Sequence, residues 1–221
     1  PALSAAGLDR VTVSLDAIDE ETFAAITDSG HTVASVLAGI EAAESVGLGP
    51  IKINTVVRKG SNEEEIVQLI ERFSDRDIAV RFIEYMDVGN TNGWSLEEVV
   101  TADEIRKKIG SLEFIESPKD SDVAKRYILP GGNEVGIITS VTEPFCGHCT
   151  RARVSADGKL FTCLFANRGI DLLSPMRDGY TDTEIEALIR QQWESRQDRY
   201  SEIRSEETAS RERVEMSYIG G

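Results

Sequence analysis

The sequence predicts an α/β protein in which a parallel sheet covered by helices is followed by a smaller α+β region. Strand-like and helix-like patterns alternate from Val11 to Tyr85, and strands separated by helices pair in parallel. After the Asn-Thr-Asn-Gly run at 90–93 the segments become short, with turn signals at Gly131-Gly132 and Asp157-Gly158. Glycine pairs and Asp-Gly favour tight hairpins, so the second region is expected to be antiparallel.

Each element of the first region follows from its periodicity. Alternating apolar residues indicate strands, and apolar residues three or four apart indicate amphipathic helices. Lys59-Gly60 closes the second strand. The expected strands are Val11–Leu15, Ile51–Val57 and Ala79–Tyr85, and the expected helices are Glu20–Ile26, Val33–Val46 and Asn62–Phe73.

The second region begins with a short helix and continues with strands. The helix is expected at Asp103–Ile109, and strands at Leu112–Ile115, Arg126–Leu129, Val135–Thr139, Arg153–Ser155 and Lys159–Thr162. A further helix is expected over Thr181–Trp193, where Thr181 as N-cap and Glu184 three residues on form a capping box. From Glu194 to Arg213, 11 of 20 residues are charged, which favours a solvated segment.

Composition excludes several classes of protein. A net charge of -15 argues against a nucleic-acid binder, whose affinity comes largely from lysine and arginine. No run approaches the roughly 18 apolar residues of a membrane helix, and residues 1–10 lack the pattern of a signal peptide. Three cysteines between 146 and 163 fit a metal site in a reducing compartment better than disulfides, so a cytoplasmic location is expected.

Because Pro1 is followed within ten residues by a strand pattern, we expect the sequence to begin partway through a fold.

Polar side chains in the expected buried strands need an explanation. Lys52 and Asn54 alternate with isoleucines, Arg81 interrupts an apolar strand, and Ser14 follows Val13. If these strands belong to a barrel, the polar residues line a ligand cavity inside it. In the alternative, Lys52 and Arg81 lie at strand edges with their charged ends in water.

The cysteines form the most specific pattern in the sequence. Cys146 and Cys149 have the two-residue spacing with which two thiolates reach one metal, and Cys163 returns after 13 intervening residues. Spacing alone favours zinc, leaves an iron–sulfur cluster as the second possibility and no metal as the third. His148 is a possible fourth ligand, but between two ligating cysteines it is expected to point away, and His31 has no partner nearby in the sequence. An open metal position could bind substrate.

Two arginines follow the second cysteine. An extended backbone puts Arg151 and Arg153 on the same side, where two guanidinium groups could hold phosphate oxygens. The alternative is a pair of surface arginines bound to carboxylates, which are abundant in this acidic chain.

Five separated motifs, in order along the chain, resemble those of the GTP 3′,8-cyclase family of molybdenum cofactor biosynthesis, which are radical S-adenosylmethionine enzymes. The motifs are Val13–Asp16, Lys52–Asn54, Arg81–Gly89, Phe145–Arg153 with Cys163, and Gly220-Gly221. The resemblance spans essentially the whole chain. It implies the second half of an incomplete radical SAM (TIM-like) barrel over 1–98, a small α+β auxiliary-cluster and GTP-binding domain over 99–195, and a charged segment with a Gly-Gly tail over 196–221.

The resemblance also implies ligands. Cys146, Cys149 and Cys163 would hold a [4Fe-4S] cluster with one iron open to the guanine of GTP, which replaces the zinc interpretation. Residues implied to contact GTP are Lys52, Arg81, Arg151, Ala152 and Arg153. Residues implied to contact S-adenosylmethionine are Ser14, Asn54 and Met86. Arg151, Arg153, Gly220 and Gly221 are the implied catalytic residues.

The implied reaction is a lyase reaction and the first step of molybdopterin synthesis. A 5′-deoxyadenosyl radical removes the ribose 3′ hydrogen of GTP, and the resulting carbon radical attacks carbon 8 of guanine. The implied partners are an electron donor, cyclic pyranopterin monophosphate synthase downstream, and a second copy of the chain in a possible homodimer, with no nucleic acid and no membrane. Radical formation needs a second [4Fe-4S] cluster on a Cys-x3-Cys-x2-Cys motif, which these residues lack. We therefore expect this chain alone to be inactive.

Two other functions fit part of the sequence. Another radical SAM enzyme with an auxiliary cluster would usually carry more C-terminal cysteines. A zinc-stabilised binding module explains the cysteines but not Lys52 or Arg81. The terminal Gly220-Gly221 would by itself be a frayed end, whereas the resemblance implies a tail that enters the barrel, with Tyr218 and Ile219 anchoring its approach.

Overall fold

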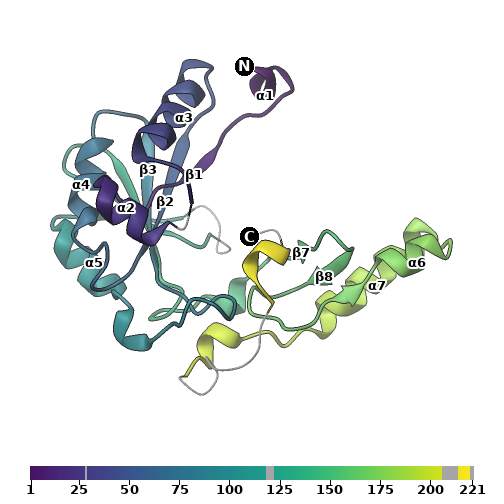
Figure 1. Cartoon of the computed structure of the whole chain (residues 1–221). Coiled ribbons are helices and arrows are strands. Elements are labelled where there is room, and N and C mark those ends of the chain that lie inside the picture. Colours follow the sequence, from purple (N-terminus) through teal and green to yellow (C-terminus); the bar gives the residue numbers. More distant parts are fainter. Residues whose placement is uncertain (28, 118–121, 206–213, 220–221) are drawn as a thin grey trace. The chain divides into compact units, whose positions relative to one another are not determined.

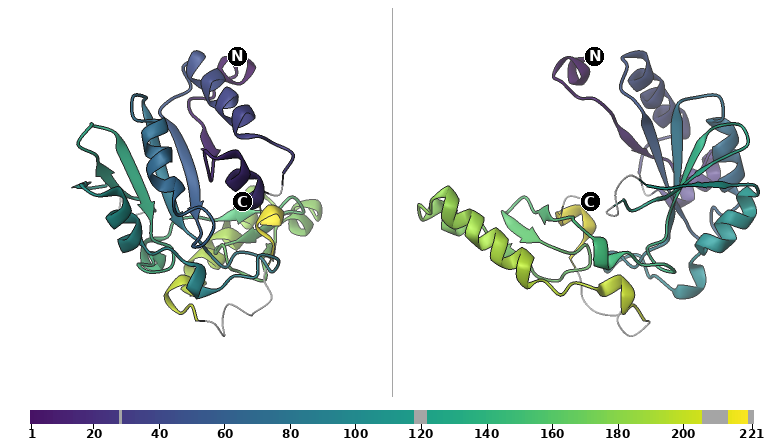
Figure 2. Two further views of the ribbon diagram at one scale, coloured as in Figure 1. Left: turned by 60° about the vertical axis from the view of Figure 1, so that its left-hand side comes forward. Right: turned by 180° about the vertical axis from the view of Figure 1, so that it is seen from behind.

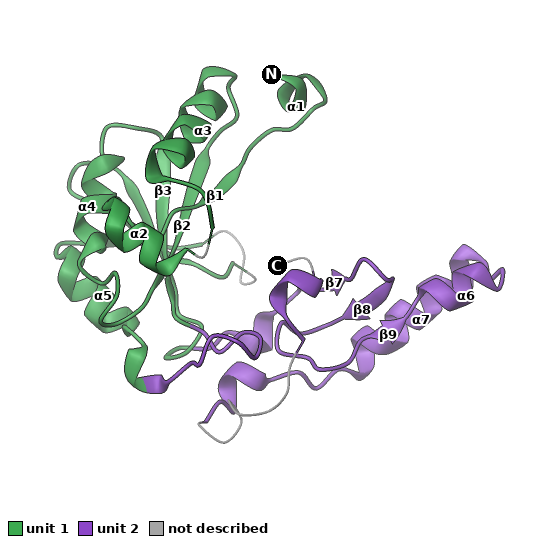
Figure 3. Ribbon diagram, in the orientation of Figure 1, with its two compact units in different colours: residues 1–85, 97–143 green, residues 86–96, 144–221 purple. Residues whose placement is uncertain are grey.

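The computed structural model describes residues 1–27, 29–117, 122–205 and 214–219. It divides into two compact units (Figures 1 and 3), of which unit 1 comprises residues 1–85 and 97–143, and unit 2 comprises residues 86–96 and 144–221. Each unit draws on two separate stretches of the sequence. A segment that directly follows the third strand therefore belongs to unit 2.

Unit 1 contains a six-stranded mixed sheet in the order β1-β2-β3-β6-β5-β4. The strands are β1 (Thr12–Ser14), β2 (Ile51–Val57), β3 (Ile78–Glu84), β4 (Glu113–Ile115), β5 (Lys125–Ile128) and β6 (Glu134–Ile138). The expected antiparallel pairing of β4, β5 and β6 is confirmed, with Gly132 in the turn before β6 at a positive φ of 89°. The parallel pairing of β6 with β3 was not predicted, because local periodicity does not encode a distant partner.

Helices lie along one face of this sheet (Figure 2). They are α2 (Glu20–Ile26), α3 (Val33–Ser45), α4 (Glu65–Arg72) and α5 (Ala102–Ile109), while the short α1 (Ala2–Ala5) precedes β1 and the 3-10 helix η1 (Leu96–Glu98) precedes α5. Side-chain caps fix their starts: Asp19 caps α2, and capping boxes begin α3 at Thr32 and α5 at Thr101. Each such cap stabilises a helix by about 1 kcal/mol.

The two faces of β2 differ as the alternation predicted. Ile51, Ile53 and Val57 are buried in the hydrophobic core, whereas Lys52 and Asn54 are only half-buried. Burial of one such apolar side chain is worth about 1.5–3 kcal/mol. The apolar face thus holds the sheet in the core and leaves the polar face available for a site.

A buried carboxylate holds the end of β3. Glu84 is 0% exposed, and its oxygens accept hydrogen bonds from the backbone N–H groups of Ala102 (2.8 Å), Val141 (2.7 Å) and Thr142 (2.9 Å). These donors belong to the start of α5 and to the loop after β6. One side chain therefore joins three segments at the point where β3 ends.

Unit 2 is built around a small antiparallel sheet of β7 (Arg153–Val154), β8 (Lys159–Phe161) and β9 (Ile170–Asp171). The Asp157-Gly158 hairpin is confirmed, with Gly158 at a φ of 80°. The helices are η2 (Cys146–His148), α6 (Leu173–Arg177), α7 (Asp182–Ser195), η3 (Tyr200–Glu202) and η4 (Met216–Ile219). The Thr181–Glu184 capping box of α7 is also confirmed.

The division into domains 1–98, 99–195 and 196–221 stays a prediction. Strands β4 to β6 lie in one sheet with β1 to β3, so residue 98 does not end that sheet. Among the described residues, no helix is both long enough and apolar enough to cross a membrane.

Candidate functional site

The strand register brings the polar residues of unit 1 into one row. Ser14 pairs with Asn54 and Asn54 pairs with Arg81, across the parallel strands β1, β2 and β3. Lys52 lies two residues before Asn54 and so shares its face of the sheet. The row continues to Gly136 on β6, where an added Cβ would lie 3.0 Å from Arg81 Cγ. Gly136 was not predicted as a site residue, although a glycine inside a strand signals such close approach.

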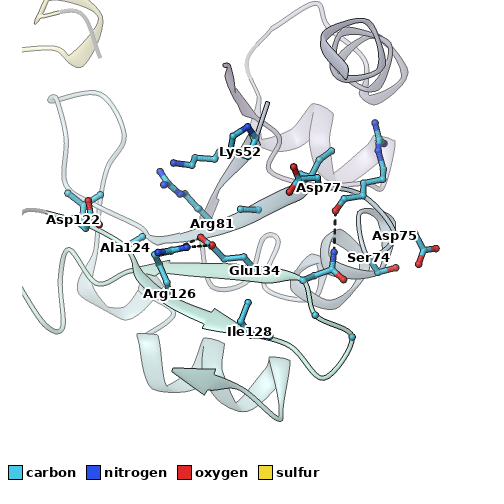
Figure 4. Close-up of a pocket in the computed structure, with 18 residues that line it drawn as sticks. Lys52, Ser74, Asp75, Asp77, Arg81, Asp122, Ala124, Arg126, Ile128 and Glu134 are labelled. Atoms are coloured by element: carbon cyan, nitrogen blue, oxygen red, sulfur yellow. Dashed lines mark hydrogen bonds and ion pairs between the residues drawn. The ribbon is translucent and has the colours of Figure 1, made fainter. Parts of the chain in front are cut away.

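Lys52 and Arg81 line a cavity of about 1030 Å³ in unit 1. Figure 4 shows both side chains reaching from β2 and β3 toward the same space. The Arg126–Glu134 ion pair lines the cavity as well, and its Nε–Oε1 distance is 2.9 Å. The cavity is thus lined by four cationic side chains and four carboxylates, namely Lys52, Arg76, Arg81, Arg126, Asp75, Asp77, Asp122 and Glu134. Arg126 pairs with Glu134 and Arg76 pairs with Glu44, whereas Lys52 and Arg81 form no ion pair among the described residues.

The pKa values of two cations in this cavity are lowered. Burial lowers the pKa of Lys52, and the nearby Arg81 guanidinium lowers it further. Burial likewise lowers the pKa of Arg81. No ion pair within the described ranges includes Lys52 or Arg81. Both residues are half-buried, and the alternative in which their charged ends lie in water stays open.

Asn54 and Ser14 have different surroundings. Asn54 Oδ1 is buried and has no hydrogen-bond partner in the described structure, which is costly for an amide oxygen and typical of an atom that accepts from a ligand. Ser14 is exposed on β1 and lines a separate, mainly apolar hollow with Val13 and Val36. Ser14 therefore pairs with Asn54 in the sheet, but Ser14 does not line the cavity that contains Lys52.

The remaining candidates belong to unit 2. Met86 directly follows the end of β3, and its carbonyl oxygen accepts a hydrogen bond from Asn92 Nδ2 at 3.2 Å. Gly220 and Gly221 lie outside the described residues. The structure thus groups the candidates of unit 1 and, separately, those of unit 2.

The three cysteines are free and partly exposed. Cys146 is the first residue of η2, Cys149 directly follows η2, and Cys163 lies two residues after β8. Burial raises the pKa of Cys163, and the nearby Asp198, Cys146 and Cys149 add to the rise. Within the described residues, no three His, Cys, Asp or Glu side chains are close enough to hold a metal ion. The donor set is suited to zinc or an iron–sulfur cluster, but the three ligands are not gathered.

Arg151 acts directly on one of these thiols. Burial alone would raise the pKa of Cys149, but hydrogen bonds from the Arg151 backbone N–H and guanidinium outweigh burial and lower it. Arg151 Nη2 lies 3.3 Å from Cys149 Sγ, and its guanidinium lies 5.1 Å from the Phe145 ring centre. This arrangement favours a thiolate, the form that ligates metals.

Arg153 is half-buried, and burial followed by the charge of Arg151 lowers its pKa. Within the described ranges, neither arginine forms an ion pair with a carboxylate. Ala152, between them, is exposed. Two guanidinium groups near thiols are thus available to an anionic ligand.

The segment 196–204, which we call the strap, contacts the loops that carry the cysteines. The Arg196 guanidinium donates to the Cys149 carbonyl oxygen, and Thr162 Oγ1 donates to Asp198 Oδ2 at 2.5 Å. The Tyr200 ring stacks on Phe165, with ring centres 4.5 Å apart. The partner in each contact is a cysteine or lies within two residues of one: Cys149 itself, and Thr162 and Phe165 beside Cys163.

A buried ion pair ends the strap. Arg204 Nε lies 2.8 Å from Asp87 Oδ1, and the two side chains are 4% and 2% exposed. Tyr200 OH donates to the other Asp87 oxygen at 2.5 Å. The prediction that this charged segment is solvated is therefore wrong for Arg204, whose charge is compensated by a residue 117 positions earlier. The aromatic residue Tyr200 inside this charged run was the sequence signal that could have indicated burial there.

Comparison with known proteins decides the family. The family model for Molybdenum Cofactor Synthesis C matches residues 78–202, more than half of the chain. The chain belongs to this family. In this member of the family, residues 1–73 also match the model of the Radical SAM superfamily.

Curated relatives agree with the family models. The chain is 44% identical over 224 residues to a protein named GTP 3′,8-cyclase from Xanthomonas campestris pv. campestris (strain B100), covering 100% of this chain and 66% of the relative. Proteins of the same name from Staphylococcus carnosus (strain TM300) and Staphylococcus aureus (strain MRSA252) are 43% and 42% identical, each covering 98% of this chain and 66% of the relative. The chain thus spans just under two thirds of the length of these relatives.

Proposed function

We propose that this chain carries out the GTP-binding and cyclising part of a GTP 3′,8-cyclase, the radical S-adenosylmethionine lyase for which its relatives are named. The observation that carries the proposal is the pair of half-buried cations, Lys52 and Arg81, which line one cavity and form no ion pair among the described residues. A polyphosphate would supply the missing negative charge. In this proposal, residues 1–98 are the second half of a radical SAM barrel.

The chain's own residues then have distinct roles. Lys52 and Arg81 bind the triphosphate, and Arg151, Ala152 and Arg153 line the remainder of the GTP site. Asn54 uses its buried, unpartnered Oδ1 to accept a hydrogen bond from S-adenosylmethionine, which Ser14 and Met86 also contact. Cys146, Cys149 and Cys163 hold a [4Fe-4S] cluster. When bound, that cluster and S-adenosylmethionine supply Lewis-acid and radical chemistry, which a water-excluding site protects.

The proposal also includes the wider setting of the reaction. Three free cysteines and an acidic composition suit a cytoplasmic enzyme with an external electron donor, a possible homodimer, and a downstream enzyme that consumes the cyclised nucleotide. Arg151, Arg153, Gly220 and Gly221 are the proposed catalytic residues.

Metal analysis tests the proposal against a zinc-stabilised module. After anaerobic reconstitution with iron and sulfide, the chain should hold one [4Fe-4S] cluster, and Cys163→Ala should lose it because two thiolates bind a cluster weakly. His148→Ala is the matched control, since His148 is an exposed donor between Cys146 and Cys149. Stoichiometric zinc without sulfide, or full iron content in Cys163→Ala, would contradict the proposal.

A further inference from the structure

The segment 214–219 is attached to the rest of unit 2 at two points. The first point is Glu215, whose Oε1 accepts a hydrogen bond from the Asn90 backbone N–H at 2.8 Å. Gly89 has a positive φ of +69°, and a Cβ added to it would lie 2.1 Å from Glu215 Oε2. The Gly89-Asn90 turn therefore accepts this carboxylate only because residue 89 has no side chain.

The second point is Tyr218. Its hydroxyl donates to Asp157 Oδ2 at 2.6 Å and lies 3.3 Å from Lys159 Nζ, which pairs with Asp157 at 2.9 Å. Its ring packs edge-on against Phe161, with ring centres 6.3 Å apart. All three partners belong to the β7–β8 hairpin, which Gly158 closes.

We propose that the Gly89-Asn90 turn and the Asp157–Lys159 turn together form a seat for residues 214–219, which fixes the position of Ile219, the residue that precedes the Gly-Gly pair. With one contact alone, the segment could still rotate about that contact. Contacts at both Glu215 and Tyr218 hold the two ends of the single turn of η4. Ile219, the residue bonded to Gly220, is 1% exposed. Asp157, Glu215 and Tyr218 are thus positioning residues, and their catalytic consequence rests on the function proposed above for the two glycines.

The charges of the seat are stable across the pH range of a cell. Hydrogen bonds from Ser155, Tyr218 and Lys159 hold the pKa of Asp157 well below its usual range. The same carboxylate and the Tyr218 hydroxyl raise the pKa of Lys159. The acceptor for Tyr218 is therefore always ionised, although its exposure to water keeps the energetic effect of each contact small.

Hydrogen exchange tests the seat directly in this chain. The Tyr218 backbone N–H donates to the Glu215 carbonyl oxygen at 3.0 Å, so its exchange rate reports the opening of η4. We expect Tyr218→Phe and Asp157→Asn each to speed exchange of residues 215–219 by about three- to tenfold. The double variant should add little, because both changes remove one contact. Gly89→Ala, which displaces Glu215, should speed exchange independently.

The control is Asp171→Asn, which alters an exposed carboxylate on β9 that accepts a hydrogen bond from the Ser174 backbone N–H instead of from the tail. Unchanged exchange in Tyr218→Phe and Asp157→Asn, or equal acceleration in the control, would overturn the seat.

The catalytic consequence is measured in the form of the enzyme that turns over GTP. Tyr218→Phe should lower the rate of cyclisation about three- to tenfold while GTP affinity and iron content stay unchanged, because its printed contacts, Asp157, Lys159 and Phe161, are not among the proposed ligand-binding residues. Faster exchange with an unaltered cyclisation rate would overturn the positioning role. Absence of cyclisation in the unaltered enzyme would count against the proposed function instead, and the exchange data would still decide whether the seat exists.

Discussion

Replacement of one cationic side chain in the cavity should weaken phosphate binding without a matching loss of fold stability. Lys52 and Arg81 repel each other, lie half-buried, and form no ion pair within the described residues. A charged hydrogen bond to phosphate is worth about 1.5–3 kcal/mol, so Lys52→Met or Arg81→Met should weaken GTP binding about 10- to 150-fold. Neither variant should be much less stable, since the lost attraction to Glu134 is offset by relief of the repulsion between the two cations.

The assay is calorimetric titration with GTP, inorganic triphosphate and guanosine, together with thermal unfolding. Both variants should lose affinity for GTP and triphosphate alike and keep their affinity for guanosine. Lys107→Met is the matched control, because it removes the same charge from an exposed position on α5 outside the cavity. Equal losses for GTP and guanosine, or a lower melting temperature with unchanged triphosphate affinity, would refute the assignment of the cavity to phosphate.

Three further predictions concern charge, stability and chemistry. Burial and Arg81 hold the pKa of Lys52 below its ordinary 10.5. The contribution of Lys52 to GTP affinity should therefore be lost as the pH rises through that lowered pKa, and Lys52→Met should show a flatter dependence of affinity on pH. Arg204→Met removes one half of a buried ion pair, and it should lower the unfolding free energy in urea, followed by tryptophan fluorescence, by more than Arg190→Met on the exposed surface of α7, which should cost under about 1 kcal/mol. Similar midpoints for the two variants would contradict the burial argument. The reduced chain should release no 5′-deoxyadenosine from S-adenosylmethionine, since its three cysteines include no Cys-x3-Cys-x2-Cys motif, and product above a protein-free background would contradict this.

Local signals were sufficient for most of the secondary structure. The bounds of α2 and β2 agree with prediction, because a cap at Asp19 and strict alternation over Ile51–Val57 act within a few residues. The start of α7 was predictable for the same reason, from Thr181 and Glu184. The short β9 and α6 were not predicted, since two and five residues are too few to show a period.

The site was predictable where it depends on alternation and not where it depends on distant partners. Lys52 and Arg81 interrupt apolar strands, and the structure places both in one cavity. The parallel pairing of β3 with β6, which brings Gly136 beside Arg81, has no local signature. Burial of Arg204 was missed because its compensating carboxylate, Asp87, lies 117 residues away. The roles of the cysteines stay a prediction, because their spacing does not specify how a bound metal would gather them.

The strap has a consequence for the order of events during protein synthesis. Domains begin to fold while the chain is still being made, starting from the N-terminus. The six strands of unit 1 are complete at Ile138, whereas the loops around Cys149 and Cys163 acquire their contacts only when Arg196, Asp198 and Tyr200 have been added. Unit 1 can therefore fold on the ribosome while the cysteine loops are still open, and these loops close after residue 204 has been translated.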